Sequence, residues 1–200
     1  MKIAVFMGGT SSEKEISLRS GEAVLESLQR QGYDVYGVVL DENNQVTAFL
    51  ENDYDLAYLV LHGGNGENGK IQAVLDILGK KYTGSGVLAS ALTMDKNKTK
   101  QIAENIGIRV PKSYRDLDSI ERFPVIIKPV DEGSSKGLFL CNNKEEAEEA
   151  VKKLAKPIIE DYIVGEELTV GVLNGKALGV LKIIPQADVL YDYDSKYAKG

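Results

Sequence analysis

A strand, a glycine turn and a helix start follow one another in residues 2–17, which read KIAVFMGGTSSEKEIS. The apolar run Lys2–Met7 ends at two glycines, as a buried strand does. Ser12 and Glu15 then have the spacing of a capping box, which predicts that a helix begins there. A strand followed at once by a helix indicates an α/β fold built on a parallel sheet.

The same rhythm continues downstream of this stretch. Gly32 is expected to end the first helix. Further strands are expected at residues 34–40 and 56–61, and a further helix at residues 71–78. This order of strands and helices predicts a parallel sheet with helices outside it.

The pattern changes after Gly86. We expect helices at residues 94–105 and 144–154, and strands at residues 124–128, 138–141, 158–162, 167–173 and 176–184. Asn174-Gly175 separates the last two strands and is a strong signal for a hairpin. The second half is therefore predicted to be α+β with antiparallel pairs, and residues 187–200 carry no helix or strand period.

Composition excludes several classes of protein. The chain has 200 residues, with 24 basic and 30 acidic side chains and a net charge of −6, which argues against nucleic acid as a partner. One His and one Cys exclude a disulfide within the chain and a metal site built from these residues. No apolar run approaches the ~18 residues of a membrane span, and the N-terminus has no signal-peptide cleavage site. We therefore expect a cytoplasmic protein with no membrane partner.

Two glycine-rich segments follow predicted strands. Gly8–Glu13 opens a helix, a place where open α/β sheets bind ligands, although a tight turn with a helix cap would look the same. His62–Gly69 has four glycines, whose backbone N–H groups can approach an anion closely. The alternative for this second segment is a flexible loop that begins with a strand-end His.

Two later segments could bind a nucleotide. Lys128–Gly137 combines a strand-end Lys with a small, serine-containing loop, which suits a lid over phosphates or a plain hairpin turn. Glu160–Ile163, followed by Glu167, could be an edge strand or a hinge that binds a base and a ribose.

A tyrosine-rich segment lies near the end of the chain. Tyr191–Tyr197 has three Tyr in seven residues, which is unusual for an exposed loop. It is either a functional loop or a disordered acidic tail.

Taken in order, these segments and Met94-Asp95-Lys96 resemble the D-alanine–D-alanine ligases of the ATP-grasp superfamily. The resemblance extends over essentially the whole chain. It implies a parallel-sheet (pre-ATP-grasp) N-terminal domain at residues 1–85, an α+β ATP-grasp central domain at 86–160 and the start of a C-terminal ATP-grasp domain at 161–200. The family's sequences continue beyond this length, and their metal ligands are expected there, so we expect residues 1–200 alone to be inactive.

The resemblance also implies a reaction. ATP, with Mg²⁺, phosphorylates the carboxylate of one D-alanine, and the amine of a second D-alanine attacks the acyl phosphate. The product D-alanyl-D-alanine serves peptidoglycan synthesis, and with it cell-wall biogenesis and cell shape. The family suggests a homodimer.

Site residues follow from the same resemblance. Glu13, supported by Ser134 and Tyr197, is expected to bind the ammonium of the first D-alanine and to act in catalysis, with His62 near the carboxylate. The expected ATP-binding residues are Lys96, Lys128, Ser134, Ser135, Gly137, Glu160, Ile163, Glu167 and Lys196. Lys196 is expected at the γ-phosphate, Glu160 and Ile163 at adenine, and Glu167 at the ribose. No metal ligand is assigned.

Two positions depart from the family pattern. Asn68 stands where the family has Asp, and we expect only a modest change in loop hydrogen bonding. Asp161 stands where the family often has Lys, which puts in doubt a side-chain contact with the base. Two alternatives remain: a non-catalytic fragment that binds a nucleotide or an amino acid, and another ATP-grasp carboxylate–amine ligase.

Overall fold

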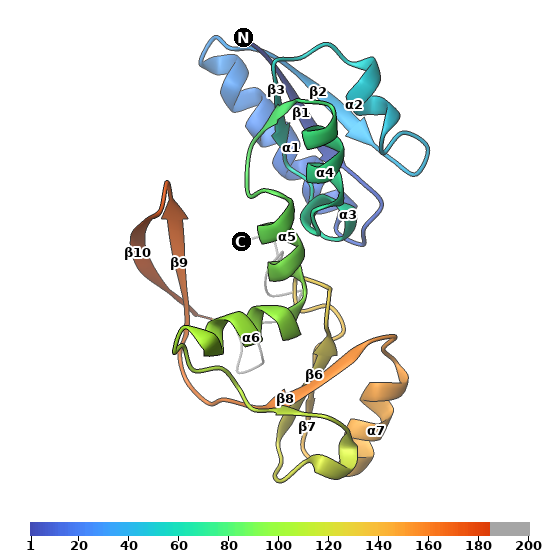
Figure 1. The fold of residues 1–200 in the computed structure, drawn as a ribbon, viewed down its shortest axis with the longest axis vertical. Coiled ribbons are helices and arrows are strands. Elements are labelled where there is room, and N and C mark those ends of the chain that lie inside the picture. Colours follow the sequence, from blue (N-terminus) through green and yellow to red (C-terminus); the bar gives the residue numbers. More distant parts are fainter. Residues whose placement is uncertain (185–200) are drawn as a thin grey trace. The chain divides into compact units, whose positions relative to one another are not determined.

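The computed structural model describes residues 1–184 (Figure 1). The chain divides into two compact units, Met1–Ile106 and Gly107–Gly200. The three-domain division implied by the resemblance stays a prediction.

The first unit contains the predicted parallel sheet. Its strands β1 (Lys2–Gly8), β2 (Asp34–Leu40), β3 (Leu56–Leu59) and β4 (Lys81–Tyr82) run in the order β2-β1-β3-β4, and all neighbours are parallel. The helices of this unit are α1 (Lys14–Arg30), α2 (Thr47–Glu51), α3 (Gly64–Glu67), α4 (Lys70–Ile77), α5 (Val87–Met94) and α6 (Lys96–Asn105). The parallel α/β prediction is therefore confirmed.

Strand β1 is buried on both faces because helices cover both sides of the sheet. On one face, Phe6 packs its ring 4.3 Å from that of Phe49 in α2, within a core that also contains Leu75 of α4. On the other face, α1 lies so close that a methyl group on Gly21 would meet the Cβ of Met7 at 2.5 Å. Only a glycine allows this approach.

The strand order places a switch point between β1 and β3. The chain leaves β1 to form β2 on one side and later returns to form β3 on the other side. In open α/β sheets, a crevice for ligands forms at the carboxyl ends of the strands where the order reverses. Both glycine-rich segments begin at these ends, since Gly8–Glu13 follows β1 and His62–Gly69 follows β3.

The second unit contains an antiparallel sheet. Strands β5 (Ser113–Tyr114), β6 (Val125–Pro129), β7 (Phe139–Cys141) and β8 (Pro157–Asp161) have the order β5-β8-β6-β7. Helix α7 (Lys144–Lys152) covers one face, where Val125, Ile127 and Cys141 lie in a core with Ala147 and Ala150 of the helix. This arrangement confirms the α+β expectation for the second half, and Cys141 is a small core residue whose thiol pKa is raised by burial.

The predicted hairpin is also present. Strands β9 (Glu167–Leu173) and β10 (Lys176–Ile183) are antiparallel. Asn174 and Gly175 have φ angles of 49° and 73°, and a two-residue turn with two positive φ values suits the twist of a hairpin.

Three local expectations were wrong or incomplete. Helix α1 begins at Lys14 with Glu13 as its N-cap and without a side-chain cap, so the capping box at Ser12 and Glu15 does not form. The helix expected at residues 94–105 is present as α6 but begins two residues later, at Lys96, because Asp95 has an extended backbone and its carboxylate caps α6 through the N–H of Lys98. The short elements α2, α3, β4 and β5, and helix α5 (Val87–Met94), were not expected. None of the helices in residues 1–184 is both long and apolar enough to cross a membrane.

Candidate active site

Glu13 is a buried acid at the switch point of the first unit. Its residue is only 6% exposed, although it precedes the first turn of α1. A methyl group built on Gly63 would lie 2.5 Å from Oε2 of Glu13, so the carboxylate rests directly against the second glycine-rich loop. Gly63 has a φ of +65°, and a glycine is therefore favoured here for both its conformation and its lack of a side chain.

Ser11 joins the two glycine-rich loops. Its Oγ accepts the backbone N–H of Glu13 at 3.1 Å and donates to the carbonyl of His62 at 2.5 Å. This residue fixes Glu13 relative to His62, and sequence reasoning did not single it out. The only signal was its place in the Gly8–Glu13 segment.

His62 has one nitrogen toward an acid and one without a partner. Its Nδ1 lies 3.9 Å from a carboxylate oxygen of Glu67. Its Nε2 is buried and meets no hydrogen-bond partner among residues 1–184. A buried polar atom without a partner is costly, so this nitrogen is suited to meet a polar group of a ligand.

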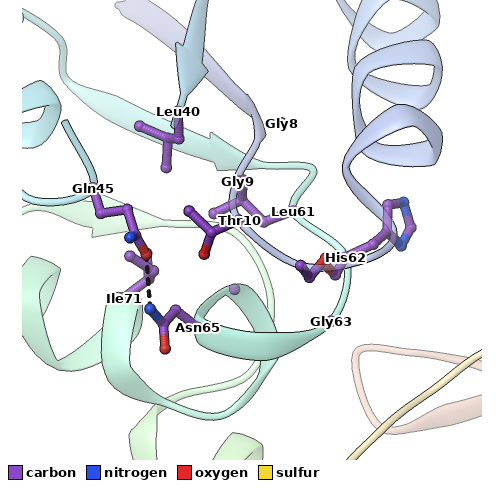
Figure 2. Close-up of a pocket in the computed structure, with 12 residues that line it drawn as sticks. Gly8, Gly9, Thr10, Leu40, Gln45, Leu61, His62, Gly63, Asn65 and Ile71 are labelled. Carbon is purple, nitrogen blue, oxygen red and sulfur yellow. Dashed lines mark hydrogen bonds between the residues drawn. The ribbon is translucent and has the colours of Figure 1, made fainter. Parts of the chain in front are cut away.

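A small cavity lies beside these loops and is closed to substrates. Its volume is about 10 Å³, which is room for one water molecule at most. Figure 2 shows Thr10, Gln45 and Asn65 around it, whereas the ring of His62 is turned away from these side chains. Nδ2 of Asn65 donates to Oε1 of Gln45 at 2.7 Å and ties the His62–Gly69 loop to the segment after β2.

A larger cavity of the first unit borders the same loop. Its volume is about 350 Å³, within the range of small-molecule sites. Its wall includes Glu67, Gln72 and Ser90. Gln72 is 5% exposed and donates through Nε2 to the carbonyl of Gly66 at 2.9 Å, while its Oε1 has no partner in the described part of the chain. Space for an amino acid is therefore available next to the loop that carries His62.

Asn68, which departs from the family pattern, is bonded to the start of the next helix. Its side-chain oxygen accepts the backbone N–H of Lys70 at 3.2 Å, at the start of α4. A carboxylate could accept the same bond, which agrees with the modest effect expected from the sequence.

Lys128 and Glu160 form an ion pair on one face of the sheet in the second unit. Strand register pairs Ile126 with Glu160 and Lys128 with Ile158, so both charged side chains point to the face opposite α7. The Glu160 side chain is 6% exposed and that of Lys128 is 23% exposed. The pair places a positive and a negative group side by side on a largely buried surface.

Asp161 points to the other face, next to the core under α7. Its Oδ1 accepts the hydroxyl of Tyr114 at 2.6 Å, and its Oδ2 accepts Nη2 of Arg122 at 2.6 Å. These bonds, with Arg122 contributing most, hold the pKa of the Asp161 carboxyl below its usual value, and they raise the pKa of Tyr114. The side chain of Asp161 therefore does not face the surface that carries Glu160 and Lys128.

The loop after Lys128 has an unusual backbone. Ser134 and Ser135 have φ angles of 52° and 56°, in the left-handed region that non-glycine residues rarely adopt. Such conformations cost about 1–3 kcal/mol each and concentrate at ligand-binding loops. Gly137 ends this loop, and a methyl group on it would meet Leu154 at 3.0 Å and Pro129 at 3.1 Å, so its place is fixed by packing.

The remaining expected residues are less enclosed. Lys96 is the first residue of α6 in the first unit. Ile163 is 60% exposed and lies between β8 and β9, and Glu167 is the exposed first residue of β9. Lys196 and Tyr197 lie outside the described residues.

Comparisons with known proteins identify the family. The family model described as "D-ala D-ala ligase N-terminus" matches residues 2–50, and the one described as "D-ala D-ala ligase C-terminus" matches residues 81–200. A D-alanine–D-alanine ligase from Fusobacterium nucleatum is 89% identical over the whole chain, which spans 70% of that relative.

Solved structures agree with this result. The D-alanine–D-alanine ligase of Bacillus anthracis superposes with a TM-score of 0.85 at 34% identity, covering 98% of this chain and 68% of that one. Its complex with ATP gives a TM-score of 0.81 at 33% identity, covering 92% of this chain and 66% of the other. The chain therefore belongs to the D-alanine–D-alanine ligase family and has the ATP-grasp fold of that family.

Proposed function

We propose that the protein joins two D-alanine molecules at the expense of ATP, through a D-alanyl phosphate, and supplies D-alanyl-D-alanine for peptidoglycan. Family membership supports the ligase activity. The observation that carries the substrate assignment is the buried carboxylate of Glu13, which lies against Gly63 at the switch point of the sheet, in a residue that Ser11 links to the backbone of His62.

In this proposal the first unit binds the first D-alanine as a zwitterion. Glu13 is the anion for the ammonium group, because a charge-assisted hydrogen bond is strong in a site that excludes water. His62 lies near the carboxylate of the substrate, where its Nε2 has no partner among the described residues. Ser134 and Tyr197 are assigned to support Glu13 in binding the ammonium and in catalysis.

The second unit supplies the nucleotide site. Lys128 provides a positive charge for the phosphates, and the carboxylate of Glu160 accepts a hydrogen bond from the amino group of adenine. Their position on the same, largely buried face of the sheet supports these roles. Ser134, Ser135 and Gly137 belong to the lid over the phosphates. The other assigned contacts are Ile163 with adenine, Glu167 with the ribose, and Lys96 and Lys196 with the phosphates.

In the proposed reaction, these side chains contribute more by positioning the substrates than by covalent catalysis. The carboxylate oxygen of the first D-alanine attacks the γ-phosphorus and ADP leaves; the amine of the second D-alanine then attacks the acyl carbon and phosphate leaves. Phosphoryl transfer depends largely on alignment and charge neutralisation. Water must be kept from the acyl phosphate, which is the task assigned to the loop with Ser134 and Ser135. The family uses Mg²⁺, but residues 1–184 bring no three acidic, His or Cys side chains together that could hold it, and no ligand is assigned.

The direct test is phosphate release by the purified full-length protein. With MgATP we expect release that depends on D-alanine and is not supported by L-alanine. Release without D-alanine would overturn the ligase assignment. Binding of ATP without any release would favour a non-catalytic nucleotide-binding protein instead.

We also propose that the protein works as a homodimer in the cytoplasm, where ATP is available. The family resemblance supports the dimer. Light scattering of the purified protein tests it, because a mass equal to one chain at micromolar concentration would overturn this part of the proposal.

A further inference from the structure

Asp161 is the last residue of β8 that the sheet holds in place. Its backbone N–H donates to the carbonyl of Lys112 at 2.9 Å, and its carboxylate is bound by Tyr114 and Arg122. Tyr114 belongs to β5, Lys112 directly precedes β5, and Arg122 lies in the segment before β6. Three bonds thus fix one residue, which is 5% exposed.

The chain becomes exposed two residues after this anchor. Sheet pairing of β8 ends at Asp161, while Ile163 is 60% exposed and Val164 is 83% exposed. The residue before the anchor, Glu160, points to the opposite face, where it pairs with Lys128. Asp161 therefore stands between the two residues that the proposed function assigns to adenine, Glu160 and Ile163.

We propose that Asp161 is a positioning residue for nucleotide selection: by anchoring the end of β8 to Tyr114, Arg122 and Lys112, it sets where Glu160 and Ile163 meet the base. This inference rests on the proposed nucleotide site. The carboxylate of Asp161 acts at a distance from the base, because it lies on the face covered by α7 and is bound by Tyr114 and Arg122.

The chemistry of the base explains why position matters. A carboxylate accepts a hydrogen bond from the 6-amino group of adenine, whereas guanine presents a carbonyl oxygen at the same place and would be repelled. A small displacement of Glu160 weakens this discrimination more than it weakens the contacts with the phosphates, which all nucleotides share. Loss of the anchor should therefore change the ratio of ATP to GTP affinity.

The test measures ATP and GTP binding to the full-length protein by calorimetry, together with thermal unfolding. For Asp161→Asn we expect ATP affinity to fall about tenfold and the ATP/GTP affinity ratio to fall at least fivefold. Two further variants each remove one contact of Asp161. We expect Tyr114→Phe and Arg122→Gln to lower the ATP/GTP affinity ratio about two- to threefold, and they replace Asp161→Asn in the test if that variant does not fold. Asp118→Asn is the matched control, since it removes the same charge from an exposed ion pair with Lys144, and it should leave the ratio unchanged.

Glu160→Gln separates this inference from the proposed function. If Glu160→Gln lowers the ATP/GTP ratio and the Asp161, Tyr114 and Arg122 variants do not, Asp161 is a structural residue only and the inference is wrong. If Glu160→Gln leaves the ratio unchanged, the adenine assignment of Glu160 fails, and the inference fails with it. A lower melting temperature with an unchanged ratio also counts against a positioning role.

Discussion

The two candidate sites hold a buried carboxylate in different ways. In the first unit, the carboxylate of Glu13 lies against the backbone of Gly63, in a glycine-rich loop near the carboxyl ends of parallel strands. In the second unit, Glu160 is held on the face of an antiparallel sheet by a lysine side chain, Lys128. The first site depends on space next to the backbone, and the second depends on a pair of opposite charges. Different substitutions should therefore impair binding at the two sites.

Removal of the lysine should produce the largest effect. Lys128→Met takes the cation away from a buried carboxylate, which typically costs about 3 kcal/mol or more of stability. Because Lys128 is also assigned to the phosphates, ATP affinity should fall about 100-fold. Urea unfolding and ATP calorimetry measure the two effects. Lys144→Met, which breaks the exposed pair with Asp118, is the control and should change neither quantity appreciably.

A double variant sharpens this result. Lys128→Met combined with Glu160→Met should regain most of the lost stability, since no buried charge remains, but it should not regain ATP affinity. Recovery of both would mean that the pair has no role in binding.

Loss of charge at Glu13 should have the next largest effect. Glu13→Gln keeps the size of the side chain but removes a charge-assisted bond worth about 1.5–3 kcal/mol. We expect the KM for the first D-alanine to rise about 10- to 100-fold and the KM for ATP to change less than twofold. Glu22→Gln on the exposed side of α1 is the control. An unchanged KM for D-alanine would remove Glu13 from the site.

A methyl group at Gly63 tests the dependence on space. Gly63 and Gly79 have nearly equal φ angles, +65° and +63°, but only Gly63 faces the Glu13 carboxylate, and nothing lies within 4 Å of a methyl group on Gly79. Alanine should cost about 1–2 kcal/mol of stability through backbone strain at Gly79, and at least as much at Gly63, whose ψ of 174° lies in a region essentially limited to glycine. Only Gly63→Ala should also raise the KM for the first D-alanine, by about tenfold. Equal steady-state constants for the two variants would show that the close approach to Glu13 is without consequence.

The smallest expected effect is on acid stability. Because the pKa of Asp161 is lowered in the folded protein, its carboxylate stabilises the fold above the usual value of 3.8, and this contribution is lost as the pH falls through the lowered pKa. Wild type should exceed Asp161→Asn by about 1–2 kcal/mol in urea unfolding at pH 7. The difference should stay constant down to about pH 5 and narrow below about pH 4. A difference that widens in acid would contradict this assignment.

Local features of the fold could be predicted from the sequence. The first strand, the end of α1 before Gly32 and the hairpin at Asn174-Gly175 depend on residues close to one another in the chain. The start of α6 was expected two residues too early, because Met94 fits the helical pattern although it belongs to α5 and Asp95 is the N-cap of α6.

The geometry of the site depends on distant residues and could not be predicted. Gly63 is far from Glu13 in the chain, so no local pattern reveals that they meet. Likewise, only the register of β6 with β8 decides that Glu160 joins Lys128 while Asp161 joins Tyr114 and Arg122. The family resemblance named Glu13, Lys128 and Glu160, but it gave none of these contacts.

One hydroxyl joins the helix to both strands at the switch point. Ser17 of α1 is fully buried; its Oγ accepts the N–H of Gly8 at 2.8 Å and donates to the carbonyl of Val60 at 2.5 Å. The last direct bond between the β1 and β3 segments is the one from the N–H of Val60 to the carbonyl of Phe6. Beyond it, the Ser17 hydroxyl bridges Gly8 and Val60, which do not bond to each other directly. The amide proton of Gly8 can exchange with solvent when its bond to Ser17 opens, which a movement of α1 away from the sheet would cause. Its exchange rate in heavy water would report the opening of the end of the sheet that we propose binds D-alanine, in an otherwise native protein, without any ligand or activity assay.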